Sequence, residues 1–455
     1  GAELLVTLQF NSPHASHNLG HFRLSMSERG TASLDDNNDG LLAAIRVPAA
    51  ERTSEQTKLI RDALEAHDTQ LTALRSEQSA AKERAKSIDA AMPKVMVMND
   101  RAEWRPTFML TRGLYNQPGE KVTAEVPASL PPLADPQNAN RLDLARWLVS
   151  RDHPLTARVT VNRFWQMLFG IGLVKTSEDF GVHGEYPVQR ELLDWLAAEF
   201  MESGWDVKHL LRTIVTSDTY QRGSMIASAA DFERDPENRL LVRGPRFRLQ
   251  AEFLRDQALV ASGLLVTKIG GPSVKSYHPP GLYEQVTAGS GTDVYVEGTG
   301  EDLYRRSMYS YWKRSVPNPA MLAFDAPFRE TCTLRRTRTN TPLQALNLMN
   351  DPTYVEAARF LAGRMLTESS PELQSQLALG FRLILSRLPT PAETAVLTSA
   401  FNRSLNDFLS DPAAATELLA IGARRSPETL DPVQLAAMTV VASTILNLDE
   451  AVMKE

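Results

Sequence analysis

Apolar residues recur every three or four positions over most of the chain beyond residue 137, and this spacing predicts amphipathic helices. The first predicted helix carries Leu142, Leu144, Ala145 and Leu148 on one face. These helices together predict a multi-helix core domain over residues 137–455. Further helices are expected within residues 152–169, 192–202, 207–214, 343–365, 373–385, 391–405 and 433–448.

The segment from Thr53 to Ala91 contains neither Gly nor Pro and is rich in Ala, Glu, Lys, Gln, Leu and Arg. That composition is typical of one long, exposed helix. Its apolar seam is thin, with Leu64, Leu71 and Leu74, and this favours a spacer between domains. Pro93 is expected to end the helix, because a helix interior does not accommodate proline.

Alternation of apolar and polar residues, which is typical of strands, occurs in residues 3–10 and 21–27. Two strands do not make a stable sheet alone. We therefore expect these strands to pair with strands outside this chain. The first residue is Gly and not Met, so we expect the natural start to lie upstream.

Residues 95–98 and 107–113 are expected to form short buried strands ahead of a proline-rich connector at 126–136. The connector is the predicted domain boundary. The fold class is therefore mainly α, with terminal strands in 1–45, a spacer helix and connector in 46–136, and the helical core beyond.

Composition narrows the possible functions. A chain of 455 residues with 43% hydrophobic residues is long enough for more than one core. No apolar run reaches the roughly 18 residues that span a bilayer, and no signal peptide is visible. The net charge is −6 and no predicted helix is strongly basic, which excludes a nucleic-acid reader.

Cys332 is the one cysteine of the chain. Covalent c-type haem needs two thiols in a C-x-x-C-H motif, so this chain cannot carry that cofactor. We interpret Cys332 as a small, buried apolar residue. His14, His17 and His21 are closely spaced, but no carboxylate or thiol lies among them, so no metal site is predicted.

Cationic residues are concentrated in an arginine-rich segment at 305–338, which has eight of them against Asp325 and Glu330. Thr339, Asn340 and Thr341 precede Pro342, a pattern that predicts a capped helix start. Arginines beside a helix N-terminus suit an anion. Pairing with the protein's own carboxylates is the alternative, and we favour it. The eight are Arg305, Arg306, Lys313, Arg314, Arg329, Arg335, Arg336 and Arg338.

A second arginine group, Arg243, Arg246 and Arg248, precedes another predicted helix and is expected to face this segment. Residues 269–300 are rich in Gly, Pro and Tyr and predict a long loop. Its Tyr277, His278, Tyr283 and Tyr295 suit either sugar stacking or plain packing. The predicted substrate-binding residues are Arg246, Tyr277, His278, Arg335, Arg336, Arg338 and Asn340.

The glycine-rich loop at 172–187 contains Asp179, His183 and Glu185. A histidine between carboxylates is suited to general acid–base catalysis, although an ordinary polar loop has the same composition. These three residues are weak catalytic candidates.

Several blocks of the sequence together resemble one protein family. They include RPTFMLTRGLYNQPGEKV, RLDLARWLVSRDHPLTARVTVNRFWQMLFGIGLVKTSEDFG, GWDVKHLLRTIVTSDTY, PFRETCTLRRTRTNTPLQALNLMNDP and LNLDE, in this order. The family is the C-terminal domain of unknown function of large exported planctomycete-type proteins. There it accompanies a c-type cytochrome domain, a second uncharacterised domain and often a concanavalin-like sandwich. The resemblance implies that residues 1–45 are the terminal strands of such a β-sandwich, whose other strands lie upstream. The chain departs from the family at Gln189 and Arg190, where a His-Pro pair is usual.

The resemblance implies a periplasmic or extracellular protein whose c-type haem lies on an upstream domain or a partner. On that basis we expect a module that binds a glycan or another anionic substrate for an extracytoplasmic oxidoreductase. The expected partners are the upstream cytochrome and sandwich domains and a polysaccharide. No nucleophile triad, P-loop or dinucleotide motif is readable, so a non-catalytic binding or assembly module is the alternative.

Overall fold

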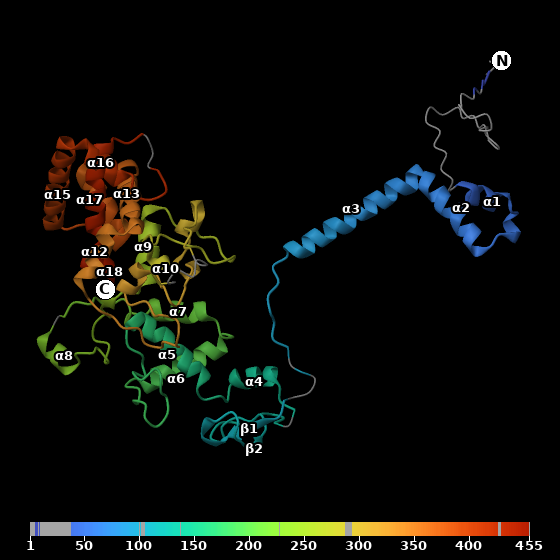
Figure 1. Ribbon diagram of the computed structural model, residues 1–455. Coiled ribbons are helices and arrows are strands. Elements are labelled where there is room, and N and C mark those ends of the chain that lie inside the picture. Colours follow the sequence, from blue (N-terminus) through green and yellow to red (C-terminus); the bar gives the residue numbers. More distant parts are fainter. Residues whose placement is uncertain are drawn as a thin grey trace. The chain divides into compact units, whose positions relative to one another are not determined.

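The computed structural model describes residues 5–7, 9, 38–99, 101, 105–136, 138–226, 228–286, 294–425 and 429–454. The chain forms two compact units, 1–104 and 105–455 (Figure 1). The strands predicted in 3–10 and 21–27 fall mostly outside the described residues, as do His14, His17 and His21. The predicted boundaries near residues 45 and 136 stay predictions.

The described residues of the N-terminal unit form the α-helices α1 (Asn38–Arg46), α2 (Ser54–His67) and α3 (Thr69–Ala91). The prediction of one continuous helix from Thr53 to Ala91 is wrong. Asp68 interrupts it, because its side chain accepts hydrogen bonds from the N–H groups of Gln70 and Leu71 and so caps a new helix. The predicted start is confirmed, since Thr53 caps α2.

The prediction of buried strands at 95–98 and 107–113 is only partly right. Residues 95–98 form no strand, and the side chain of Met96 is fully exposed. Residues 107–110 do form strand β1 (Thr107–Leu110), which pairs antiparallel with β2 (Pro118–Val122), but all four residues of β1 are exposed. Among the described residues, no second layer of secondary structure covers the hairpin of β1 and β2, so the side chains of β1 stay exposed.

The first helices of the larger unit surround a core of their own. This core contains Val161, Trp165, Leu196 and Leu210 and is built by α5, α6 and α7. Asp206 caps α7 as expected from its place before the apolar stripe. The helices in this part of the chain are α4 (Arg141–Leu148), α5 (Thr156–Phe169), α6 (Arg190–Glu202), α7 (Val207–Val215) and α8 (Ala229–Arg234).

The second core of this unit joins α9 to the C-terminal helices, with α13 packed on both α9 and α17. The helix predicted over 343–365 is broken, because Pro352 begins a new helix that Asp351 caps. The short helices α10, α11, α16 and α18 were not predicted. The elements are α9 (Ala251–Ser262), α10 (Leu282–Val286), α11 (Pro319–Ala323), α12 (Pro342–Asn350), α13 (Pro352–Thr367), α14 (Leu373–Leu385), α15 (Pro391–Ser410), α16 (Pro412–Leu419), α17 (Pro432–Leu446) and α18 (Asp449–Val452).

Two connections join these cores. A two-residue strand β3 (Phe247–Arg248), just before α9, pairs antiparallel with β4 (Met453–Lys454). The extended segment 327–340 also runs between them, and the Gln166 side chain on α5 donates to the Leu334 carbonyl at 3.2 Å. The protein is mainly α, as predicted.

Candidate functional site

A cavity of about 390 Å³ lies where the end of α5, the loop 222–247 and Arg338 meet. Four arginines line it, Arg239, Arg243, Arg246 and Arg338, against a single carboxylate, Glu237. We call this cavity the arginine pocket. Its volume is within the range of about 300–1,000 Å³ that is usual for small-molecule sites.

The loop that carries three of these arginines is rigidly built. The buried Asp235 carboxylate accepts the backbone N–H groups of Arg239 and Leu240 at 2.8 and 2.6 Å. The Asn238 amide holds both the N–H and the carbonyl of Arg243, at 3.2 and 2.7 Å. Asn238 and Leu241 have φ values of 54° and 60°, a left-handed backbone that costs energy for residues other than glycine. The loop is therefore pre-organised to present its arginines.

Arg338 reaches the pocket from the arginine-rich segment. Its guanidinium stacks 4.2 Å from the centre of the Phe247 ring and donates to the Gly170 carbonyl at 3.3 Å. Gly170 has φ 86°, and a Cβ there would lie 2.9 Å from Phe247 and 3.1 Å from Arg338. A glycine is needed at this position because of the positive φ and this close approach.

The side chain of Arg338 is exposed as a whole, but its guanidinium is partly desolvated, which lowers the pKa of Arg338 from its usual value. An arginine stays protonated even so. The group therefore presents a full charge to the pocket, with most of its five N–H donors unused by the described residues.

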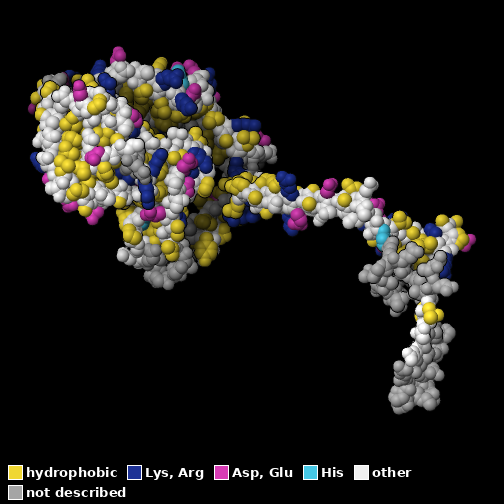
Figure 2. All heavy atoms as spheres, turned by 90° about the horizontal axis from the view of Figure 1, so that it is seen from above, with side chains coloured by type: hydrophobic (Ala, Val, Ile, Leu, Met, Phe, Trp, Pro, Cys, Tyr) yellow, Lys and Arg dark blue, Asp and Glu magenta, His cyan; other side chains and the backbone are white. Residues whose placement is uncertain are grey.

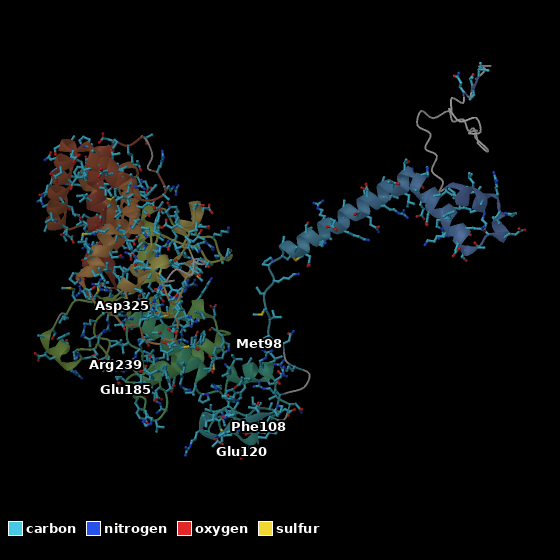
Figure 3. All side chains as sticks on the ribbon, in the orientation of Figure 1. Met98, Phe108, Glu120, Glu185, Arg239 and Asp325 are labelled. Atoms are coloured by element: carbon cyan, nitrogen blue, oxygen red, sulfur yellow. The ribbon has the colours of Figure 1, made fainter. Side chains whose placement is uncertain are left out.

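Three charged groups of the pocket are held by internal ion pairs. Arg239 donates to Glu185 at 2.8 Å, and Figure 3 shows these two side chains close together. Arg246 pairs with Asp449 on α18. The carboxylate of Glu237 is held by the Lys175 ammonium at 2.7 Å.

Arg243 and Arg338 have no carboxylate within 4.0 Å among the described residues. The guanidinium of Arg243 donates to the carbonyls of Asp235 and Pro236 and lies 5.3 Å from the centre of the Phe232 ring. Both groups thus have no carboxylate partner among the described residues, and each lies over an aromatic ring. This arrangement suits the binding of anionic groups.

Arg335 and Arg336 are paired outside this pocket. Arg335 donates to Glu178 at 2.5 Å, and Arg336 donates to Glu252 on α9 at 2.6 Å. Both arginines line a separate cavity of about 360 Å³. The favoured interpretation of internal pairing therefore holds for these two residues.

The start of α12 differs from its prediction. Pro342 does begin the helix, but the Thr341 side chain makes no capping bond. The Thr339 hydroxyl and N–H bind Asp325 instead, and the Asn340 side chain accepts from Arg248 at 2.7 Å. The second arginine group does face the arginine-rich segment, as predicted.

Cys332 corrects another prediction, since it is exposed and not buried. It lies in the extended segment 327–340, where no helix or strand covers it among the described residues.

Tyr277 and His278 lie elsewhere, at a third cavity of about 590 Å³. His278 is buried and packs edge-on against Tyr283, which is also buried. The Tyr277 hydroxyl donates to the buried Glu356 carboxylate at 2.9 Å, and burial raises the pKa of Tyr277. These contacts are those of packed side chains, as in the plain-packing alternative, although the buried Nε2 of His278 has no hydrogen-bond partner among the described residues. The predicted surface around Arg246, Tyr277 and Arg338 is divided between separate cavities.

Asp179, His183 and Glu185 make no hydrogen bond or ion pair with one another among the described residues. The Asp179 carboxylate accepts the N–H of Gly181 at 2.7 Å within its own turn, and Glu185 is engaged by Arg239. His183 is exposed and makes no hydrogen bond or ion pair with the part of the chain described.

In the part of the chain that the structure describes, no group of three or more His, Cys, Asp or Glu side chains is arranged to hold a metal ion. Every described helix is too short or too polar to cross a bilayer. On the face seen in Figure 2, Lys and Arg are interspersed with Asp and Glu.

Sequence reasoning selected Arg246 and Arg338 for binding but missed the pocket that joins them. Arg239 and Arg243 were not proposed as binding residues, and Gly170 and Phe247 were not singled out. The dense run RGPRFR at 243–248 was the available signal, since it places three arginines within six residues.

A comparison with known families matches residues 140–401, more than half of the chain, to PSD1, a protein of unknown function (DUF1553). No curated protein and no solved structure matches the chain. The matched range includes every pocket-lining residue from Trp165 to Arg338. The chain belongs to the PSD1 family of proteins of unknown function (DUF1553).

Proposed function

We propose that this chain is a binding module for an anionic ligand, which it holds in the arginine pocket through Arg338. The ligand class we favour is an acidic glycan, bound on behalf of an exported, periplasmic or extracellular oxidoreductase. In this proposal the haem is carried by an upstream cytochrome domain or a partner, and the chain supplies the substrate contacts.

The uncompensated charge of Arg338 is the observation that carries the proposal. Arginine clusters in proteins usually pair with carboxylates, as Arg335 and Arg336 do here. Arg338 instead lines a cavity, fixed by Phe247 and Gly170, with no such partner among the described residues. A planar guanidinium held in this way matches the fork geometry of a carboxylate or a sulfate.

A non-catalytic assembly module is the second candidate. Its support is the internal pairing of Arg335 and Arg336, which gives those residues a structural role without any ligand. In that case the arginine-rich segment only joins the two cores.

The test is calorimetric titration of galacturonate oligomers into the wild-type protein and an Arg338→Ala variant. Loss of a charge-assisted bidentate contact should weaken binding about 10- to 100-fold. Arg338→Lys should bind with intermediate affinity, because it keeps the charge but loses the fork.

Arg212→Ala is the matched control, since Arg212 is an exposed arginine on α7 outside the pocket. It should bind as the wild type does. If neutral and acidic oligomers fail alike to bind the wild-type protein, the assembly module becomes the better account.

A further inference from the structure

We propose that the ligand of the arginine pocket carries two separate anionic groups, one bound by Arg338 and the other by Arg243. This inference rests on the proposed function and makes its ligand class more specific. The inference rests on a comparison of the charged groups of the pocket. Some of them are already paired within the protein, and others are not.

The compensated charges are Arg239, Arg246 and Glu237. Glu185 and Asp449 hold the two arginines, and Lys175 holds the glutamate. A ligand anion gains less from these arginines, because it must compete with a carboxylate that is already in place. Their role is to form the wall of the pocket.

The Asp449 pair belongs to a larger attachment of the C-terminal residues. Asp449 begins α18, and β4 directly after it pairs with β3, which carries Phe247. Leu249 donates its N–H to the Val452 carbonyl at 2.9 Å. These bonds fix the wall beside Arg246 and Phe247, so the pocket has little freedom to rearrange its ion pairs.

Arg243 and Arg338 remain as the two uncompensated cations. They reach the pocket from different segments, and each lies against its own aromatic ring, Phe232 or Phe247. Because each guanidinium is held separately by its own contacts, we infer that each binds its own anionic group. A ligand with two acidic groups on neighbouring units satisfies both, and a diuronate is such a ligand.

Neutral polar side chains of the pocket are consistent with a hydroxylated ligand. Gln189 and Ser224 line the cavity, and their side chains make no hydrogen bond with the described residues. Sugar hydroxyl groups are suitable partners, since both side chains can donate and accept.

The experiment compares three probes on the full chain: galacturonate, digalacturonate and inorganic phosphate. The wild type should bind digalacturonate about tenfold more tightly than galacturonate, because a second charged contact is worth roughly that factor. Phosphate, with its charge on one centre, should bind no better than galacturonate.

Arg243→Ala should bring the affinities for galacturonate and digalacturonate close to each other, whereas Arg338→Ala should weaken both. Arg212→Ala should leave the ratio unchanged. Circular dichroism of each variant confirms that it is folded.

Equal binding of galacturonate and digalacturonate, with both still dependent on Arg338, would overturn this inference and leave the proposed function intact. Phosphate binding as tight as that of digalacturonate would also overturn it. Absence of any Arg338-dependent binding would overturn both proposals.

Discussion

Neighbouring arginines of the 327–340 segment have different surroundings, and this difference decides their energetic roles. The side chain of Glu252, the partner of Arg336, is 16% exposed. The side chain of Glu178, the partner of Arg335, is 44% exposed. Removing one member of a buried pair leaves an uncompensated charge in a poorly solvated place. An exposed pair leaves a charge that water solvates.

We therefore predict that Arg336→Ala lowers the free energy of unfolding by about 1–3 kcal/mol. This is less than the roughly 3–5 kcal/mol for breaking a fully buried pair, because the pair is partly exposed and Arg329 also lies 4.0 Å from Glu252. Arg335→Ala should lower it by less than about 1 kcal/mol. Urea unfolding of both variants measures the difference. Equal effects of the two substitutions would contradict this account of the segment.

At the site, the sequence predicts residue types but not the contacts that single residues make. The excess of arginine at 305–338 was readable, but pairing depends on contacts such as Arg335 with Glu178, which lies 157 positions away. Cys332 was misjudged because its exposure is set by the path of the segment and not by its residue type. The stacking of Arg338 on Phe247 is likewise a tertiary contact between distant positions.

At the level of elements, helix type was readable and helix continuity was not. The prediction for α14 matches its observed bounds, Leu373–Leu385, because its apolar spacing is uninterrupted. The breaks at Asp68 and Asp351 depend on a side chain that binds the N–H groups of the residues after it. Asp occurs inside many helices, so its type alone does not predict a cap.

The turn between α14 and α15 contains a strong ion-pair cluster. Arg387 donates to both oxygens of Glu393, at 2.9 and 2.6 Å, and also to Glu450 on α18. Hydrogen bonding to Arg387 lowers the pKa of Glu393 from 4.5 to about 2. The cluster thus connects the C-terminal α18 to the helical bundle through a charged carboxylate.

This depressed pKa predicts a pH dependence. A carboxyl group with a lower pKa in the folded state contributes its full stability above its unfolded pKa, and loses it as pH falls through the folded value. The contribution of Glu393 should therefore be complete above about pH 4.5 and disappear toward pH 2.

Urea unfolding at pH 7 and pH 3 measures this effect. The loss of stability on acidification should be smaller in Glu393→Gln than in the wild type, because the variant has no proton to gain at this site. Glu417→Gln, at an exposed position of α16, is the control and should behave as the wild type. An identical acid response of Glu393→Gln and the wild type would refute the assigned role.

For the whole molecule, the mainly helical class follows from apolar spacing, since burial of the apolar face drives each helix to pack. The sequence predicted one helical core domain over 137–455 and did not predict its division into separate cores. The position of the site does not follow. It depends on how the segment 327–340 and the C-terminal β4 connect the cores, and these links join residues more than 150 positions apart. The local pattern of apolar and polar residues does not predict contacts between positions so far apart in the sequence.

The central claim is that Arg338 binds the anionic group of a ligand inside the arginine pocket. A crystal structure of the protein soaked with digalacturonate tests it most directly. The account predicts density in the pocket, with one ligand carboxylate at a charge-assisted hydrogen-bond distance of about 2.7–2.9 Å from the Arg338 guanidinium. Ligand density at Arg335 or Tyr277 with the arginine pocket empty would contradict it.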